Sequence, residues 1–409
     1  MAAIGLLVAL LAAGGLLLTR KPQPVQARSN FLNVFVATYP ATTGSKLNSC
    51  QLCHTAAMPA RNSYGIDYGS HGHNFQAIEQ GMEYASGAPG TEIGTNAYSY
   101  QFGECEVQVL VRDDKGSAEE TATVARELIE KDQVDMLVGT VSSGSTATLQ
   151  EIAKESDKVL IVAPAAANDI TGANFNEYTF RTSRENYQDF INLCEYLTTQ
   201  YDKFIQIAPD YSFGYGGAAS ARDACTKFGG EFVADDIFAP LDTTDFTPYM
   251  EQIADSGAEA WIVTWAGGGF VPMFQSAKEL GVLDTMGMGA SYFDNKTMAA
   301  IFGPVADKMT GQASGILYHY TAPDNAINDW LVEQVKARYN EPPDLFDADA
   351  MNAAFLAMNA LAKTEGDTSS AALIKAMEGI EFDGPKGKIS VRPEDHVAIQ
   401  DMYLSLIHI

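Results

Sequence analysis

The chain has 409 residues, of which 46% are hydrophobic and 19% charged, a globular composition with enough length for two or three domains. Its 52 acidic residues against 26 basic ones give a formal net charge of −26. Such a chain repels nucleic acids and anionic membrane surfaces, which excludes those partners and predicts a solvated acidic surface.

The first 27 residues are interpreted as a signal peptide or an uncleaved anchor. Residues 2–18 are an unbroken apolar and small-residue run, and Val25-Gln26-Ala27 resembles a cleavage site. Arg20 and Lys21 follow the run and no basic residue precedes it, so either the true start lies upstream or the segment is an anchor. A periplasmic or extracytoplasmic location follows from either reading.

Residues 28–80 are interpreted as a small, mainly α-helical fragment similar to a c-type cytochrome. Cys50-Gln-Leu-Cys53-His54 matches the motif that attaches haem c, with His54 as the iron ligand. A redox-active cysteine pair and a zinc site are the alternatives for these cysteines. The candidates for the distal iron ligand are Met58, His71 and His73.

From residue 81 onward, strand-like and helix-like blocks alternate. Apolar strands are predicted at 106–112, 134–139 and 159–163, with helices at 117–131 and 145–156 between them. This order is typical of a parallel sheet that is covered on both faces. A second block of the same kind has strands at 204–208, 231–237, 260–264 and 286–288, and two further helices at 328–339 and 350–364. We therefore predict an α/β protein with two Rossmann-like lobes.

Ligands of open parallel sheets bind beyond the carboxyl ends of the strands, so the loops that follow strands are the candidate sites. Small, hydroxyl-bearing or aromatic residues occupy these loops: Ser142, Ser143, Ala165, Ala167, Asn168, Tyr211, Phe213 and Trp265. The alternative is that the serines only cap a helix and that the alanines only form a tight loop. His319 and His396 belong to no catalytic motif, and we expect no enzyme activity.

Residues 81–403 resemble the leucine/isoleucine/valine-binding family of type I periplasmic binding proteins, the substrate-binding components of ABC importers. The resemblance rests on motifs in the family's order: Arg112-Asp-Asp-Lys-Gly116, Val138-Gly-Thr-Val-Ser-Ser-Gly144, Ile170-Thr-Gly172, Tyr178-Thr-Phe-Arg-Thr182, Pro209-Asp-Tyr-Ser-Phe-Gly214, Asn328-Asp-Trp-Leu331, Met377-Glu-Gly-Ile-Glu-Phe-Asp-Gly-Pro-Lys-Gly387 and the tail Arg392-Pro-Glu-Asp-His396 with Gln400.

The resemblance implies two lobes that are joined by three hinge crossings and close over a small ligand, with a membrane permease as partner. It also implies roles for single residues. Ser143 would bind the ligand carboxylate, Ala165 and Ala167 would lie beside it, and Phe213 and Trp265 would provide aromatic walls. The implied divisions are 81–183 for the first part of lobe one, 184–316 for lobe two and 317–403 for the return to lobe one.

Two departures from the family pattern stand out. Where amino-acid binders carry an acid for the ligand ammonium, this chain has Gly289-Ala-Ser291, with Asp294 nearby. The ligand is therefore a branched-chain amino acid held differently, an amide, or a carboxylate without an amine. We also expect the family's first strand to be missing, and only 31–36 offers a weak substitute. A lobe without its central strand would expose two edges and aggregate.

The joining of these parts has two explanations. Residues 404–409 do not continue the family tail and look non-native, which favours a chain assembled from two gene fragments. The rival explanation is a genuine fusion of a c-type cytochrome, active in electron transfer or redox sensing, with a binding protein. Among Cys105, Cys194 and Cys225, either one disulfide or buried thiols are expected.

Overall fold

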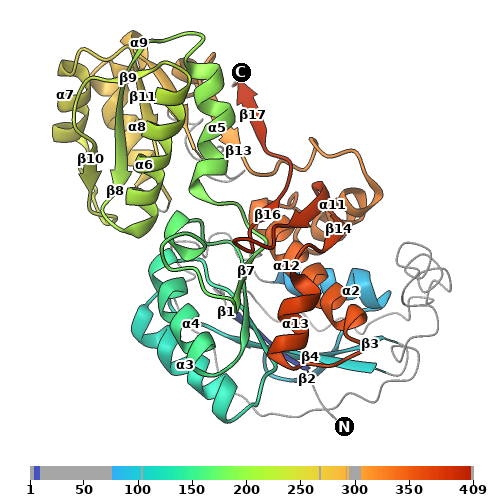
Figure 1. Ribbon diagram of the computed structural model, residues 1–409. Helices are drawn as coiled ribbons and strands as arrows, with labels where there is room; N and C mark the ends of the chain where they lie inside the picture. The colour runs from blue at the N-terminus through green and yellow to red at the C-terminus, as the bar shows by residue number, and fades with distance from the viewer. Residues whose placement is uncertain are drawn as a thin grey trace. The chain divides into compact units, whose positions relative to one another are not determined.

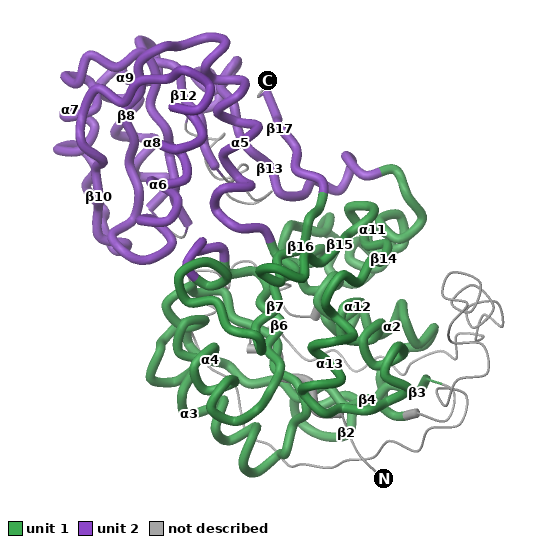
Figure 2. Tube along the Cα trace, viewed as in Figure 1, with its two compact units in different colours: residues 1–165, 170–183, 324–400 green, residues 166–169, 184–323, 401–409 purple. Residues whose placement is uncertain are grey.

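The computed structural model describes residues 4–9, 76–102, 105–266, 269–291, 293 and 305–406. The chain divides into two compact units, which Figure 2 shows in green and purple. Unit 1 comprises residues 1–165, 170–183 and 324–400, and unit 2 comprises 166–169, 184–323 and 401–409. The main passages from one unit to the other thus follow Ser183, Pro323 and Gln400. The second of these lies a few residues beyond the position that the family resemblance implied.

Unit 1 contains a seven-stranded sheet in the order β2-β3-β4-β1-β5-β6-β7 (Figure 1). The strands β1, β4, β5, β6 and β7 run parallel, while β2 and β3 are antiparallel additions at one edge. Every residue of β5, β6 and β7 is buried, as in a sheet with both faces covered. The apolar runs predicted β5 and β6, whereas β7 was not predicted. The bounds are β1 Ile4–Ala9, β2 Thr91–Gly94, β3 Ala97–Phe102, β4 Cys105–Arg112, β5 Met136–Val138, β6 Val159–Val162 and β7 Thr179–Arg181.

The place that we expected to be vacant in this sheet is filled by β1. Ile4–Ala9 pairs in parallel with β4 along its whole length, and residues 6–8 pair on the other side with β5. The prediction of a missing central strand is therefore wrong, and the exposed edges expected to cause aggregation are absent among the described strands. The substitute proposed at 31–36 lies outside the described residues. Because β1 falls within the predicted export segment 1–27, this sheet requires that residues 4–9 remain in the folded protein.

The helices of unit 1 begin at caps that the sequence encodes. The side chain of Ser117 accepts a hydrogen bond from the backbone of Glu120 (3.4 Å) and starts α3, which we predicted at 117–131. Helix α12 begins several residues before the predicted start, because Asp344 and Asp347 form a capping box there. The helices are α2 Gln76–Ser86, α3 Ala118–Glu130, α4 Ser143–Glu155, α11 Ala326–Tyr339, α12 Leu345–Lys363 and α13 Ser370–Met377. The short helix η5 Asn168–Ile170 begins in the segment of unit 2 and ends at the first residue of the next segment of unit 1.

Helix α2 corrects the boundary drawn at residue 80. It runs across that boundary and packs on α12, where a Cβ added to Gly81 would lie 2.6 Å from Cβ of Ala354. Only a glycine permits this close approach of the two helices. Residues 76–80 therefore belong to unit 1 and not to a cytochrome-like fragment.

The tail motif of the resemblance has a structural role in unit 1. The buried ring of His396 stacks on Phe180 at 3.9 Å, and its Nδ1 lies 3.0 Å from the carbonyl of Thr179. Gln400 donates from Nε2 to the carbonyl of Thr182 (3.1 Å). These contacts fix the tail to β7 beside a three-stranded sheet of β14 Glu381–Gly384, β15 Gly387–Val391 and β16 Ala398–Ile399.

Glu79 on α2 makes the stability of unit 1 depend on pH. Burial, and then the nearby charge of Glu83, raise the pKa of Glu79 from its ordinary 4.5 to about 8, although Arg338 opposes the shift. Between these pH values the folded protein holds a proton that the unfolded chain has lost. The free energy of unfolding should therefore fall as pH rises through this window, by up to about 1.4 kcal/mol per pH unit.

Glu79→Gln should abolish this fall in stability and leave the variant more stable than the parent at pH 9. Urea denaturation at pH 5 and pH 9 measures the difference. Glu119→Gln, which changes an exposed carboxylate on α3, is the matched control and should keep the parent's pH dependence. Equal slopes for the parent and the Glu79 variant would contradict the assignment.

Unit 2 has a mixed sheet in the order β10-β8-β11-β12-β13-β17, with β9 paired to β8. The predicted strand 231–237 is in fact two short strands, β9 and β10, with an irregular segment between them. The bounds are β8 Lys203–Pro209, β9 Glu231–Phe232, β10 Ile237–Ala239, β11 Ala260–Val263, β12 Gly287–Ala290, β13 Ala313–Ile316 and β17 Tyr403–Leu406. The helices are α5 Asn186–Leu197, α6 Ser212–Lys227, α7 Thr247–Asp255, α8 Phe270–Glu279 and α9 Val282–Thr285.

The last strand of unit 2 lies partly in the tail that we interpreted as non-native. β17 pairs antiparallel with β13, and Leu404 and Leu406 lie opposite Gly315 and Ala313. Asn192 on α5 donates to the carbonyl of Met402 just before this strand (3.4 Å). Residues 404–406 are therefore an edge strand of unit 2.

A disulfide between Cys194 and Cys225 joins α5 to α6. Both half-cystines are fully buried in a core cluster with Phe190, Leu193 and Phe204. The sequence left this pairing open among several cysteines. The side chain of Cys105 lies outside the described residues.

Candidate functional site

The start of α4 is the first candidate for ligand contact, and it lies in unit 1. Ser142 is the N-cap, and its Oγ accepts a hydrogen bond from the backbone of Ser145 (3.5 Å). Ser143, the first helical residue, is 3% exposed. Behind them, the Thr140 hydroxyl donates to the carbonyl of Ser142 (2.9 Å). This pattern orients the turn that leads from β5 into the helix.

The electrostatics of this helix start suit an anion. The first turn of α4 contains no acidic side chain, so nothing in it opposes a negative charge. A Cβ added to Gly144 would meet only the Oγ of Ser142, at 3.7 Å, so the backbone is open there. Free N–H groups and the helix dipole at such an end stabilise a carboxylate. The structure also bears out the capping role that was the alternative for Ser142, and the two roles are compatible.

The alanine loop after β6 is built from buried backbone. Ala165 and Ala167 are 2% and 3% exposed. In unit 1 the amide of Ala165 donates to the carbonyl of Thr140 (3.1 Å), and its carbonyl accepts from the Ser183 hydroxyl (3.0 Å). The loop is thus held against the turn that precedes α4. Ala167 falls in the short segment that belongs to unit 2.

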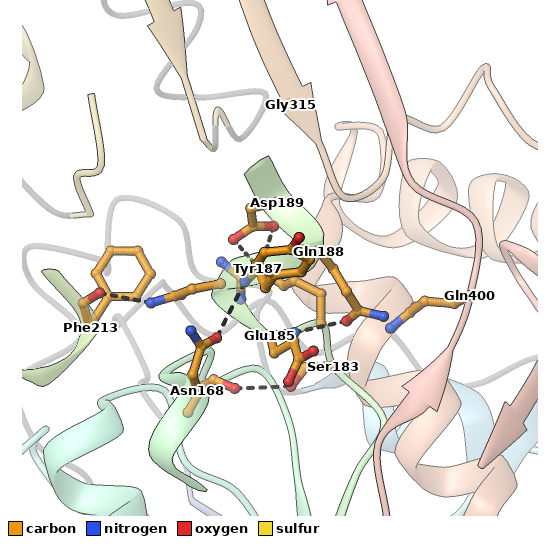
Figure 3. A network of polar contacts seen from close by, with 12 residues as sticks. Asn168, Ser183, Glu185, Tyr187, Gln188, Asp189, Phe213, Gly315 and Gln400 are labelled. Atoms are coloured by element: carbon orange, nitrogen blue, oxygen red, sulfur yellow. Dashed lines mark hydrogen bonds and ion pairs between the residues drawn. The ribbon is translucent and has the colours of Figure 1, made fainter. Parts of the chain in front are cut away.

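Asn168 uses both ends of its amide within unit 2. Its Nδ2 donates to the Ser220 hydroxyl on α6 (2.7 Å), and its Oδ1 accepts from the backbone of Tyr187 on α5 (3.3 Å). In Figure 3 the side chain of Asn168 points toward the backbone of Tyr187. The structure therefore gives Asn168 a supporting role between α5 and α6, and the ligand contact stays a prediction.

Tyr211 and Phe213 begin α6, directly after β8. Tyr211 is the N-cap and half-buried, and its ring centroid lies 5.9 Å from that of Phe213, which is 5% exposed. The turn depends on Gly214, where an added Cβ would lie 1.8 Å from the carbonyl oxygen of Pro209. The two aromatic rings thus stay together at the carboxyl end of a parallel strand, as predicted.

Trp265 lies elsewhere than we expected. Its side chain is fully buried in the core of unit 2 and meets Phe246 edge to face, with ring centroids 5.2 Å apart. A Cβ added to Gly269 would lie 2.6 Å from its Nε1. The indole packs in the core of this unit, and its contact with a ligand stays a prediction.

Ser291 follows β12, where amino-acid binders of the resembling family place an acid. The residue is 1% exposed, and its backbone amide donates to the carbonyl of Val263 (2.9 Å). Its Oγ has no hydrogen-bond partner among the described residues. Asp294, the nearby acid, lies outside them.

The cofactor expected at the N-terminal fragment cannot be placed. Cys50, Cys53 and His54, with the candidate distal ligands Met58, His71 and His73, all lie outside the described residues. Within the described ranges, no three His, Cys, Asp or Glu side chains gather as a metal site would require. In the same ranges, no helix is both long and apolar enough to cross a bilayer.

The sequence reasoning missed Thr140 and Asn186. Thr140 is fully buried and bonds Thr146 as well as Ser142. Asn186 is 1% exposed and is the first residue of α5. The feature that marks both residues is a buried polar side chain next to a loop that follows a strand. Burial depends on the tertiary structure, so the sequence alone could not identify them.

A family model described as periplasmic binding protein matches residues 83–407. The chain belongs to the periplasmic binding protein family. The match begins after the C-x-x-C-H motif, so it lends no support to a cytochrome-like fragment, and it runs through most of the tail that we expected to be non-native.

Curated relatives and solved structures agree with this family. The chain is 26% identical, over 76% of its length and 81% of the relative's, to Leu/Ile/Val-binding protein homolog 6 of Brucella suis biovar 1. It is 31% identical to the crystal structure of an ABC-type branched-chain amino acid transporter from Rhodopseudomonas palustris, with a TM-score of 0.67 over 82% of this chain and 87% of the other.

A second solved structure shares the fold. A solute-binding protein of an ABC transporter from Rhodopseudomonas palustris HaA2, in complex with p-hydroxybenzoic acid, gives a TM-score of 0.73 at 20% identity, over 84% of this periplasmic binding protein and 90% of the other chain.

Proposed function

We propose that this periplasmic binding protein is the extracytoplasmic substrate-binding component of an ABC importer. The observation that carries the proposal is the start of α4 at the carboxyl end of β5, which is open and has no acidic side chain in its first turn. The 31% identity to an ABC-type branched-chain amino acid transporter from Rhodopseudomonas palustris supports it. It delivers a small molecule to a membrane permease and catalyses no reaction. The two lobes close over the ligand, as the family resemblance implies.

The disulfide supports the extracytoplasmic location. Disulfides persist in oxidising compartments such as the periplasm and are rare in the reducing cytosol. Cys194 and Cys225 form one inside unit 2, where both half-cystines are buried. Export of the chain would allow this bond to form and remain.

The ligand that we propose carries a carboxylate, which the start of α4 would bind. A branched-chain amino acid fits this requirement, and so does an organic acid without an amine. The Tyr211 and Phe213 pair supplies apolar contact for a hydrocarbon or aromatic group. Isothermal titration with L-leucine, 4-methylpentanoate, L-leucinamide and p-hydroxybenzoate separates the classes, because the first two differ only in the amine and the third lacks the carboxylate. Binding of L-leucinamide alone would overturn the proposed carboxylate contact.

Ser143→Ala should weaken binding of the compound that the parent protein binds. Loss of a hydrogen bond to a charged group costs about 1.5–3 kcal/mol, which corresponds to roughly a 10- to 100-fold rise in Kd. Ser145→Ala removes a buried hydroxyl from the same turn and is the matched control, with an affinity that should stay near the parent's. Equal affinities for the parent and the Ser143 variant would remove Ser143 from the site.

A further inference from the structure

Two candidate ligand loops of unit 2 meet at the start of α5. Residues 166–168 form the first loop, and residues 211–213 form the second, at the start of α6. Both loops are far in sequence from one another, yet each is hydrogen-bonded to α5. Figure 3 shows Asn168, Tyr187 and Phe213 around this junction.

Asn186 bonds both loops at once. Its backbone amide donates to the carbonyl of Ala166 (2.8 Å), and its side-chain Nδ2 donates to the carbonyl of Phe213 (2.8 Å). The residue is 1% exposed, so water does not compete for these carbonyls. Buried hydrogen bonds of this kind fix geometry strongly, because an unpaired buried carbonyl is costly.

A second connection runs parallel to the first. Asn168 joins the backbone of Tyr187 to the Ser220 hydroxyl, and that hydroxyl donates in turn to the carbonyl of Gly216 (2.7 Å). The first loop is thereby tied to α6 as well as to α5. A shift of either loop would break bonds in both connections.

Two glycines at the start of α6 bring its backbone close to its neighbours. A Cβ added to Gly216 would lie 2.8 Å from Nδ2 of Asn186, and one added to Gly217 would lie 2.4 Å from a methyl carbon of Thr264. The start of α6 therefore lies directly against Asn186 and the end of β11. Because no glycine side chain separates the backbone of α6 from Asn186, we expect the position of Phe213 to depend on Asn186.

We infer that Asn186 is a positioning residue of the ligand site, which sets the relative placement of the loop at 166–168 and the aromatic pair at 211–213. The inference rests on the proposed function, since it assigns Asn186 to the support of those ligand loops. Groups that contact a ligand gain affinity when supporting residues hold them in the binding geometry before the ligand arrives. Asn186 is thus expected to control affinity through the loops and not through a ligand contact of its own.

The test is amide hydrogen exchange on the purified full chain without ligand, combined with titration of the four compounds named above. Asn186→Ala removes the side-chain bond and keeps the backbone bond, while Asn186→Asp keeps the size and replaces the donor by a carboxylate. Ser220→Ala is a milder change that removes the acceptor of Asn168 and the bond from the Ser220 hydroxyl to the carbonyl of Gly216, and leaves both hydrogen bonds of Asn186 in place. The matched control is Gln206→Ala, because Gln206 is a buried amide that donates to a different carbonyl of α6, that of Ala218 (3.0 Å).

Exchange at residues 166–168 and 211–216 should rise about tenfold in both Asn186 variants, with β8 and β11 still protected. Ser220→Ala should accelerate exchange mainly at 166–168, which tests the inference even if the Asn186 variants do not fold. The Kd of the compound that binds the parent should also rise about tenfold in the Asn186 variants and stay unchanged in Gln206→Ala.

Unchanged exchange in both loops, or equal acceleration by Gln206→Ala, would overturn the inference. A parent protein that binds none of the four compounds would instead refute the proposed ligand class, and the exchange data would still decide the role of Asn186.

Discussion

Leu7→Pro is expected to unfold unit 1. Leu7 lies in the middle of β1 and is paired with Leu110 of β4 on one side and Leu137 of β5 on the other. Proline has no backbone N–H and is excluded from central strands, so the change removes a ladder bond and disturbs both neighbours. We expect a loss of about 3 kcal/mol or more in the free energy of unfolding, measured by urea denaturation.

Leu7→Val is the control for this prediction, because valine keeps the N–H and favours strands. Hydrogen exchange adds spatial detail, since β4 and β5 should lose protection in the proline variant while β8 and β11 of unit 2 keep it. Equal stability of the two variants would show that residues 4–9 do not form the central strand.

The intact mass of the exported protein is a second test of whether residues 4–9 form the central strand of unit 1. Residues 4–9 cannot be both a cleaved signal and a strand of the folded sheet. The paired β1 predicts a mature protein that retains these residues. A mature chain that begins after Ala27 would leave the predicted signal peptide correct and β1 absent from the functional protein.

Removal of the Cys194–Cys225 disulfide is expected to destabilise unit 2 by about 3–4 kcal/mol, according to the loop-entropy relation for a separation of this size. The two cysteines are 31 residues apart and join α5 to α6, so the bond restricts the unfolded chain from the end of α5 through β8 and most of α6. The double variant Cys194→Ser and Cys225→Ser, compared with the parent in urea denaturation, measures the effect.

Reduction provides the control for this experiment. A thiol reductant should lower the stability of the parent to that of the double variant and leave the variant itself unchanged. A parent protein whose stability does not respond to reductant, or a variant as stable as the parent, would contradict the pairing.

The sequence by itself determined the features that depend on neighbouring residues. The caps at Ser117 and Ser142 and the apolar strands before them were predictable, because capping and hydrophobic periodicity are local. The lobes and the loops that follow their strands come from the same local order. The family motifs then identified which of these loops to consider.

Only the tertiary structure decided which residues meet across long stretches of chain. It showed that Trp265 lies in the core of unit 2 and that the Asn168 amide hydrogen-bonds to both α5 and α6. It also showed that Cys194 forms a disulfide with Cys225. It also put residues 4–9 and 403–406 into sheets whose other strands lie far away in sequence. Burial and strand pairing of this kind depend on contacts between residues that are distant in sequence. A local sequence pattern does not specify which distant residue makes the contact.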